Sequence, residues 1–212
     1  MEGAYTQDRE KALGAEMNAL AVKGAEAYYR TMIRHDAASW NIRDRHMVDA
    51  LERLMDYHGQ DARAVVWEHN THIGDARATD MADEGMVNVG QLLREKYADE
   101  VFAIGFGTYR GTVIAGQAWG APQEEMRVPG AIRNSWEELL HRHGAEDKLL
   151  IFKSADSILE DSIIGHRAIG VVYHPEWELG NYVPTRIARR YDAFIYLDQT
   201  RALTPITAGS FT

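Results

Sequence analysis

The sequence predicts an α/β protein in which helices cover the faces of a mostly parallel β-sheet. Short, continuous apolar runs rich in β-branched and aromatic residues recur along the chain, which is typical of strands buried on both faces. Stretches with apolar residues at helical spacing separate several of these runs, and such alternation favours parallel pairing. The 212 residues, of which 45% are hydrophobic and 26% charged, fit one soluble globular domain over residues 1–212.

Two helices are expected before the first strand. Apolar residues at helical spacing predict a helix over residues 7–34, within a helical lead-in that covers residues 1–40. A second helix is expected to begin with Asn41 as its N-cap and to end at Gly59, because Asn favours the first position of a helix and Gly the position after its end.

The remaining chain alternates between strands and helices. Six apolar runs are predicted as strands: residues 63–67, 101–106, 112–115 (after a break at Gly111), 149–152, 167–173 and 193–197. Helices are expected over residues 89–97 and 135–143, and Ser135 with Glu138 forms a capping-box pattern at the start of the second. Residues 107–133 are rich in glycine, proline and polar side chains, so they are expected to form a long loop or a small hairpin.

A cluster of polar residues directly follows the first predicted strand, and it is the best candidate site. Ligands of open α/β sheets bind beyond the carboxyl ends of the strands. Histidine is the side chain best suited to proton transfer near neutral pH, so His69 and His72 are the predicted catalytic residues. The neighbouring residues predicted to contact substrate are Glu68, Asn70, Asp75 and Arg77.

Two other interpretations of this cluster stay open. A histidine near a strand end often has a structural role, in which it bonds to the backbone of a loop. His69, His72 and Asp75 also supply nitrogen and oxygen ligands suited to zinc or iron. The zinc-hydrolase helix motif spaces its histidines four apart, whereas the spacing here is three and the segment follows a strand. Direct acid–base use, which requires no cofactor, is therefore favoured.

Further candidates lie outside the cluster. Arg43 is suited to hold a carboxylate or a developing oxyanion, although Arg43-Asp44 also fits the capped, exposed start of a helix. His174 and Glu176 follow the fifth predicted strand and are candidates to face the same crevice as His69; the alternative is a solvated loop. The segment after Asn181 resembles a helix entry, and the arginines that follow are expected on a solvated face: Arg186, Arg189 and Arg190.

Composition excludes several classes of protein and site. The net charge of −9 and the absence of basic runs argue against a nucleic-acid partner. No apolar run approaches the roughly 20 residues needed to cross a bilayer, and the polar N-terminus is no secretory signal, so a cytoplasmic location is expected. The chain has no cysteine, which excludes disulfides and thiolate chemistry. The Gly-x-Ser-x-Gly motif is also missing, which disfavours a standard serine hydrolase.

Four separated motifs, in the same order, resemble the second half of the erythromycin esterase-like family. They are residues 41–47 (Asn-Ile-Arg-Asp-Arg-His-Met), 67–79 (Trp-Glu-His-Asn-Thr-His-Ile-Gly-Asp-Ala-Arg-Ala-Thr), 167–173 (Arg-Ala-Ile-Gly-Val-Val-Tyr), and 181–184 with 191–196. The resemblance covers residues 41–205 and leaves residues 206–212 as a tail. It implies a three-layer α/β/α hydrolase with a deep cleft, in which a histidine activates water to open an ester or lactone. His69 and His72 inherit a catalytic role by this resemblance, and Arg43 a cleft-lining role.

The sequence departs from the family at one important point. The family's Gly-Glu-x-x-His-Gly motif, which carries the principal base and a carboxylate near the start of the complete protein, does not occur here. We therefore expect an incomplete domain, equivalent to the C-terminal half, whose partners are a small ester or lactone and a missing N-terminal segment. We expect this chain alone to be inactive. The rival hypotheses are a noncatalytic remnant that binds a small molecule or a partner, and a metal-dependent hydrolase.

Overall fold

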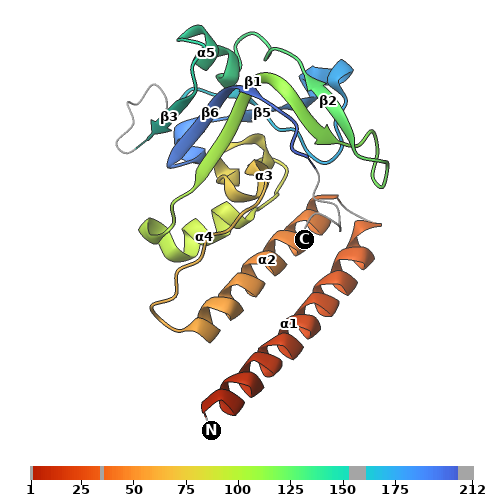
Figure 1. Cartoon of the computed structure of the whole chain (residues 1–212), viewed down its shortest axis with the longest axis vertical. Coiled ribbons are helices and arrows are strands. Elements are labelled where there is room, and N and C mark those ends of the chain that lie inside the picture. Colours follow the sequence, from red (N-terminus) through yellow and green to blue (C-terminus); the bar gives the residue numbers. More distant parts are fainter. Residues whose placement is uncertain (1, 34–35, 153–160, 205–212) are drawn as a thin grey trace. The chain divides into compact units, whose positions relative to one another are not determined.

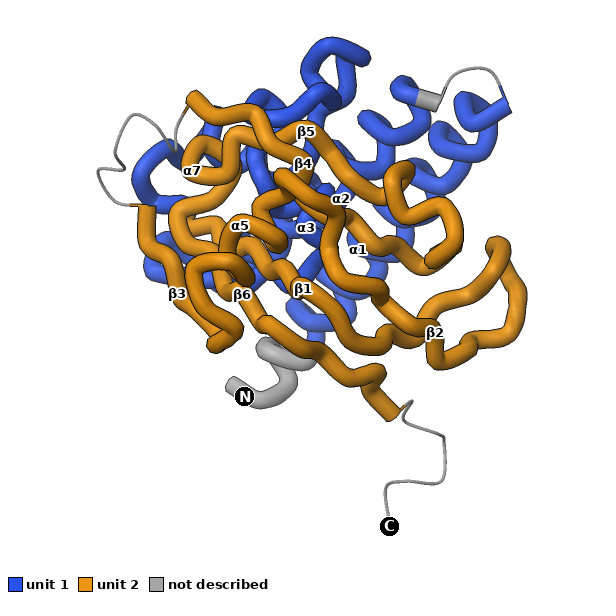
Figure 2. The backbone as a smooth tube through the Cα atoms, turned by 90° about the horizontal axis from the view of Figure 1, so that it is seen from above, with its two compact units in different colours: residues 1–101 blue, residues 102–212 orange. Residues whose placement is uncertain are grey.

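In the computed structural model (Figure 1), the chain divides into two compact units, residues 1–101 and residues 102–212 (Figure 2). The described residues are 2–33, 36–152 and 161–204. The predicted tail over residues 206–212 lies outside them. Within these ranges, no helix is both long and apolar enough to cross a membrane. The predicted α/β fold class is confirmed, with helices in both units and a β-sheet in the second.

Two long helices pack against each other in the first unit: α1, Glu2–Met32, and α2, Asp36–His58. Their close approach depends on a glycine, since a Cβ atom on Gly24 would lie 2.8 Å from Nδ1 of His46. The predicted N-cap at Asn41 is wrong, because α2 begins before it. The Asn41 amide instead donates to the carbonyl of Gly85 and accepts from the N–H of Val87, at 2.9 and 2.8 Å.

Short helices follow in the same unit: α3, Asn70–Ile73; η1, Ala76–Ala78; η2, Asp80–Ala82; α4, Val89–Tyr97; and η3, Ala98–Glu100. The predicted helix over residues 89–97 is confirmed as α4. Its N-cap, Asn88, is fully buried. The Asn88 side chain accepts from the N–H groups of Gln91 and Ala76 and donates to the carbonyls of Thr71 and Gly74. Asn88 therefore ties α4 to the segment that carries the predicted histidine cluster.

The first predicted strand, over residues 63–67, is wrong. The structure assigns no strand to these residues, and the side chains of Val65 and Trp67 are 92% and 84% exposed. Their apolar β-rich sequence favours an extended conformation, but a strand also requires a neighbouring strand to bond its backbone. The described part of the first unit contains no strand that could supply this pairing.

A mixed four-stranded sheet forms the centre of the second unit, in the order β2-β1-β6-β3. The strands are β1, Ile104–Ala115; β2, Glu124–Val128; β3, Lys148–Ile151; and β6, Ala193–Thr200. The central pair β1 and β6 is parallel, and the outer strands β2 and β3 pair antiparallel with it. The predicted strands over 149–152 and 193–197 are confirmed. The expected mostly parallel sheet is instead mixed, because β1 and β2 form an antiparallel hairpin and β3 also runs antiparallel to β6.

The two predicted strands over residues 101–106 and 112–115 fall on the single strand β1, although residues 101–103 lie before its start at Ile104. The predicted break at Gly111 is wrong, because this residue stays in the strand with a φ of 144°. A Cβ atom there would lie 2.1 Å from the carbonyl oxygen of Thr200, so only glycine fits. The hairpin formed by β1 and β2 confirms the hairpin alternative for residues 107–133.

One face of this sheet packs against an aromatic core. Glycines on β1 make room for it: a Cβ atom on Gly105 would lie 2.7 Å from the Tyr191 ring, and one on Gly107 would lie 2.5 Å from that of Phe194. Helix α5, Trp136–Arg142, contacts β1 and β6. Its predicted N-cap is confirmed, because the Ser135 hydroxyl accepts from the N–H of Glu138 at 3.2 Å.

A second, two-stranded sheet pairs β4, Ile164–Arg167, with β5, Tyr182–Thr185. The predicted strand over residues 167–173 is wrong beyond its first residue. The predicted helix entry at 181–186 is also wrong, because Tyr182–Thr185 form β5; the segment between the strands contains η4, Pro175–Asn181.

The arginines after β5 do not form one solvated face. A short helix, α7 (Ile187–Arg190), follows the strand, and Arg190 is fully buried. Its Nη1 donates to the hydroxyl of Thr185 at 2.9 Å. Arg189 is exposed and pairs with Asp161 at 2.6 Å. The predicted solvated face therefore fails at Arg190, because this short helix turns one of its arginines into the core.

Asp198 on β6 makes the second unit sensitive to acid. Burial raises the pKa of its carboxyl, but hydrogen bonds from the Tyr196 hydroxyl and from His141, both at 2.6 Å, outweigh burial and leave the pKa below its ordinary 3.8. A lowered folded-state pKa stabilises the protein at pH values above 3.8, and this stability is lost as the pH falls through the folded-state value. We expect Asp198→Asn to reduce the unfolding free energy more at pH 7 than at about pH 3. Urea unfolding of both proteins at each pH tests this; an equal loss at both would contradict it.

Candidate functional site

A histidine–aspartate pair forms the centre of the site in the first unit. Nδ1 of His72, on α3, lies 3.0 Å from Oδ1 and 2.9 Å from Oδ2 of Asp44, on α2. The Asp44 side chain is 0% exposed and that of His72 is 17% exposed. Because a carboxylate only accepts hydrogen bonds, the Nδ1 of His72 donates, and this leaves Nε2 as the ring nitrogen that can accept a proton.

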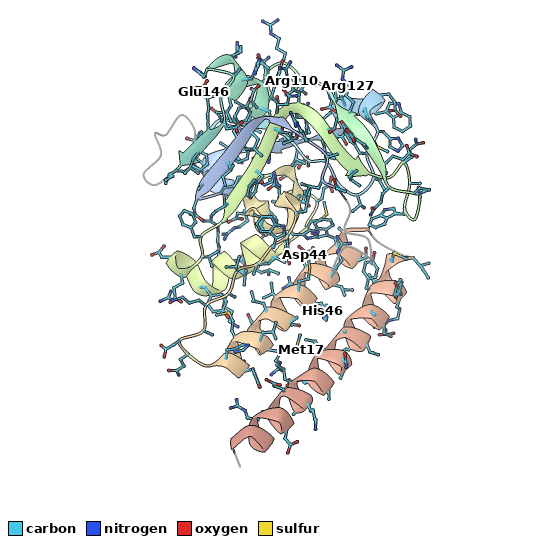
Figure 3. The ribbon with its side chains drawn as sticks, in the orientation of Figure 1. Met17, Asp44, His46, Arg110, Arg127 and Glu146 are labelled. Atoms are coloured by element: carbon cyan, nitrogen blue, oxygen red, sulfur yellow. The ribbon has the colours of Figure 1, made fainter. Side chains whose placement is uncertain are left out.

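Asp44 is a functional candidate that the sequence-based prediction missed, since it was interpreted as part of a helix cap. Instead it lies inside α2, and Figure 3 labels it on this helix. The N–H of Val89, the first residue of α4, donates to its Oδ2 at 3.2 Å. The missed signal was periodicity: Trp40, Asp44 and Val48 are four residues apart, so a carboxylate stands on the helix face that carries apolar side chains.

Trp40 packs against the face of the His72 ring. The two rings stack with centroids 4.6 Å apart and planes 3° apart. The indole N–H donates to the carbonyl of Val87 at 2.9 Å, which fixes the tryptophan. The guanidinium carbon of Arg43 lies 4.8 Å from the centre of the same Trp40 ring system. The predicted substrate contact Arg43 is thus close to the ring that stacks on His72.

Glu68 supplies a second carboxyl group near the pair. Burial raises its pKa, the charge of His72 lowers it by a smaller amount, and the charge of Asp44 raises it further. Its Oε2 is buried and has no hydrogen-bond partner within the described ranges. The site therefore holds two carboxyl groups in different environments, Asp44 bonded to His72 and Glu68 without a bonded partner, which is a recurrent arrangement in acid–base catalysis.

His69 has a different position from His72. It is exposed and forms the N-cap of α3. Its Nδ1 lies 2.9 Å from the hydroxyl of Thr71 and accepts from the Thr71 N–H at 3.3 Å. Nδ1 of His69 thus has the structural role that was the alternative to catalysis, since it bonds to the backbone of the segment that follows. Asn70, also a predicted substrate contact, is the first residue of α3.

Asp75 and Arg77 pair with each other. The Nε and Nη2 atoms of Arg77 lie 3.0 and 2.7 Å from the two carboxylate oxygens of Asp75, which also caps η1. The hypothetical metal ligands His69, His72 and Asp75 thus have separate partners: Thr71, Asp44 and Arg77. Within the described residues, no group of three or more His, Cys, Asp or Glu side chains is placed to hold a metal ion.

His174 and Glu176 belong to the second unit. Nδ1 of His174 lies 3.3 Å from Oε1 of Glu176, and the histidine ring packs at a tilt on Trp177 with centroids 5.1 Å apart. These two residues are therefore close to each other. Their predicted position in one crevice with His69 stays a prediction.

Solved structures share the fold of this chain. A protein from Bacillus cereus has a TM-score of 0.64 and 16% sequence identity, over 78% of this chain and 40% of its own. A succinoglycan biosynthesis protein has a TM-score of 0.63 and 17% identity, over 83% of this chain and 43% of its own. A mutant of the erythromycin esterase EreC in its open conformation has a TM-score of 0.54 and 16% identity, over 92% of this chain and 53% of its own.

These comparisons place the chain in a family. It spans between 40% and 53% of the length of the three structures, so it corresponds to about half of each. The sequence model named Erythromycin esterase matches residues 2–200, which include both units and the pair of Asp44 and His72. The match covers nearly the entire chain, and this confirms the resemblance of the four motifs: the chain belongs to the erythromycin esterase family.

Proposed function

We propose that this chain contributes a water-activating histidine, His72, to the hydrolysis of a small ester or lactone, beside the base that the family carries in its Gly-Glu-x-x-His-Gly motif. The observation that supports this role most directly is the bond between Nδ1 of His72 and the fully buried carboxylate of Asp44. A carboxylate in this position orients the ring and stabilises the imidazolium that forms when Nε2 takes a proton. Membership of the erythromycin esterase family supports hydrolysis as the type of reaction.

In the proposed reaction, Nε2 of His72 removes a proton from a water molecule as the water oxygen bonds to the carbonyl carbon. The resulting tetrahedral intermediate carries a negative charge on the former carbonyl oxygen. Its bond to the leaving oxygen then breaks, and the proton on Nε2 passes to that oxygen to give an alcohol and an acid. Asp44 stays ionised throughout and holds the ring through Nδ1.

His69 assists in the proposed site by orienting water or stabilising the oxyanion, and Glu68 and Asn70 contact substrate. The other groups of the reaction come from a second segment. This part of the proposal is supported by the missing Gly-Glu-x-x-His-Gly motif and by the chain's coverage of 40–53% of the related structures. We propose that a further segment, equivalent to the part of the related structures that this chain does not cover, completes the site.

A second candidate function is a noncatalytic module that binds a partner polypeptide. The exposed residues Val65 and Trp67, two positions apart in the sequence, favour it, because exposed apolar patches often mark an interaction surface. The two candidates make different predictions for hydrolysis, since the noncatalytic module has no esterase activity in any combination.

We expect His72→Gln to lower kcat/KM for ester hydrolysis at least tenfold, and about 10²- to 10⁴-fold if His72 is the sole base. We expect His69→Asn to lower it at least tenfold as well, but by less than His72→Gln, because His69 only assists the reaction. Asparagine is chosen because it preserves the N-cap of α3. The assay uses a p-nitrophenyl ester, with the chain alone and with a supplied N-terminal half.

The matched control is His58→Gln, since this exposed histidine stands at the end of α2. It should leave kcat/KM unchanged. Unchanged kinetics in both His72 and His69 variants would rule out the catalytic assignment. Absence of hydrolysis by the wild type in both combinations would favour the noncatalytic module.

A further inference from the structure

Arg43 is a half-buried cation without a bonded partner. Its side chain lies over Trp40, with the guanidinium carbon 4.8 Å from the ring centre, and within the described ranges it forms no hydrogen bond or ion pair. A guanidinium has five N–H donors arranged in a fixed fork. Partial burial removes some of the water that would otherwise bond these donors, so this arginine can bond an acceptor that the described residues do not supply.

The carboxylate next to Arg43 in the sequence already has hydrogen-bond donors. Asp44, the next residue, accepts from Nδ1 of His72 and from the N–H of Val89. Arg77 in the same unit shows the opposite behaviour, since it lies against both oxygens of Asp75 and within 3.6 Å of Oε1 of Glu95. Arg43 therefore differs from Arg77 in that its charge is not neutralised by a neighbour.

The position of Arg43 links it to the proposed base. The Trp40 ring contacts both groups: the His72 ring is stacked at 4.6 Å and the Arg43 guanidinium lies at 4.8 Å. Trp40 is fixed through its bond to the Val87 carbonyl. Cation–π contact with a fixed indole restrains the guanidinium plane and leaves its edge N–H groups available. Arg43 and His72 thus share Trp40 as a neighbour.

We propose that Arg43 binds a carboxylate group on the substrate, so that the site prefers esters or lactones that carry a negative charge near the bond to be broken. Arginine matches a carboxylate in two parallel hydrogen bonds, which gives orientation as well as affinity. This inference rests on the proposed function for its account of turnover, but the binding site is defined without it. The raised pKa of Glu68 supports it, because a carboxyl group that retains its proton to higher pH repels a bound anion less.

The kinetic test compares two p-nitrophenyl esters of equal chain length, one whose acyl chain ends in a carboxylate and one that ends in a methyl ester. We expect Arg43→Met to raise KM for the charged ester by about 10- to 100-fold, as for the loss of a hydrogen bond between charged groups. KM for the neutral ester and kcat for both should change less than threefold. Arg43→Lys should retain part of the discrimination, because it keeps the charge but loses the planar fork.

The binding test does not require turnover. Calorimetric titration with glutarate should show binding to the wild type and to His72→Gln, and Arg43→Met should weaken Kd at least tenfold. The matched control is Arg45→Met, an exposed arginine on the same helix, which should leave Kd unchanged. Circular dichroism establishes that each variant is folded, and Arg43→Lys serves if Arg43→Met is not.

The outcomes separate the two proposals. Glutarate binding that depends on Arg43, in a protein without esterase activity, would support the carboxylate site and contradict the proposed function. Hydrolysis that depends on His72, with equal effects of Arg43→Met on both esters, would overturn the carboxylate site alone; a large drop in kcat for both would indicate an oxyanion contact instead. A wild type that binds no glutarate, or binds it equally after Arg43→Met, would also overturn it.

Discussion

Replacing Asp44 with asparagine is expected to lower kcat/KM for ester hydrolysis by about 10²- to 10⁴-fold, the contribution of a positioned general base. The carboxylate stabilises the imidazolium form of His72 and keeps the proton on Nδ1, so that Nε2 is ready to accept one. An asparagine can keep the contact with the N–H of Val89 through its carbonyl oxygen, but it carries no charge. The measurement is steady-state hydrolysis of a p-nitrophenyl ester by the chain with its supplied N-terminal half.

Two further measurements make this prediction specific. The double variant Asp44→Asn with His72→Gln should be no slower than His72→Gln alone, because residues that act as a unit are not additive. Nitrogen NMR of His72 should show the proton on Nδ1 in the wild type and a mixture of tautomers in Asp44→Asn, with or without catalysis. Activity near that of the wild type in Asp44→Asn would show that Asp44 has no role in catalysis.

Arg167→Met is expected to reduce the free energy of unfolding by about 3–5 kcal/mol, the effect of removing one partner of a buried ion pair. The Arg167 side chain is 2% exposed and its Nε lies 2.7 Å from Oε1 of Glu178. Its Nη1 donates to the carbonyls of Thr108 and Tyr109 at 2.9 and 3.0 Å, and its Nη2 to that of Pro129 at 2.9 Å. Arg167 thus joins β4 to β1 and to the segment after β2.

The loss is large because Arg167→Met leaves several partly buried acceptors unpaired. Glu178 would keep only the hydroxyls of Tyr173 and Tyr182, at 2.7 and 3.1 Å, to balance its charge. Urea unfolding measures the effect, and Arg127→Met is the control, since Arg127 is exposed on β2 (Figure 3). Adding Glu178→Gln should recover part of the stability lost in Arg167→Met. A loss below about 1 kcal/mol, the range of an exposed pair, would contradict the prediction.

Local patterns in the sequence were sufficient for several elements. The helix over residues 89–97, the cap at Ser135 and the strands near 149–152 and 193–197 agree with the structure, because helical spacing, capping residues and continuous apolar runs act within a few residues. The four motifs also identified the family, since order and spacing along the chain are properties of the sequence itself. His72 was predicted from its position in the polar cluster, and its catalytic role stays a prediction.

Contacts between distant segments decided which other segments form strands and which side chains pair. Residues 63–67 have the composition of a strand, but a strand exists only where another supplies its hydrogen bonds, and no local pattern shows whether a partner is present. Asp44 looked like a cap, and its packing beneath His72 depends on residues 28 positions away. The sequence alone thus determined the fold class and the family, and it indicated His72 as a candidate. Tertiary structure alone decided the partner of that histidine, because burial and bonding depend on contacts between remote parts of the chain.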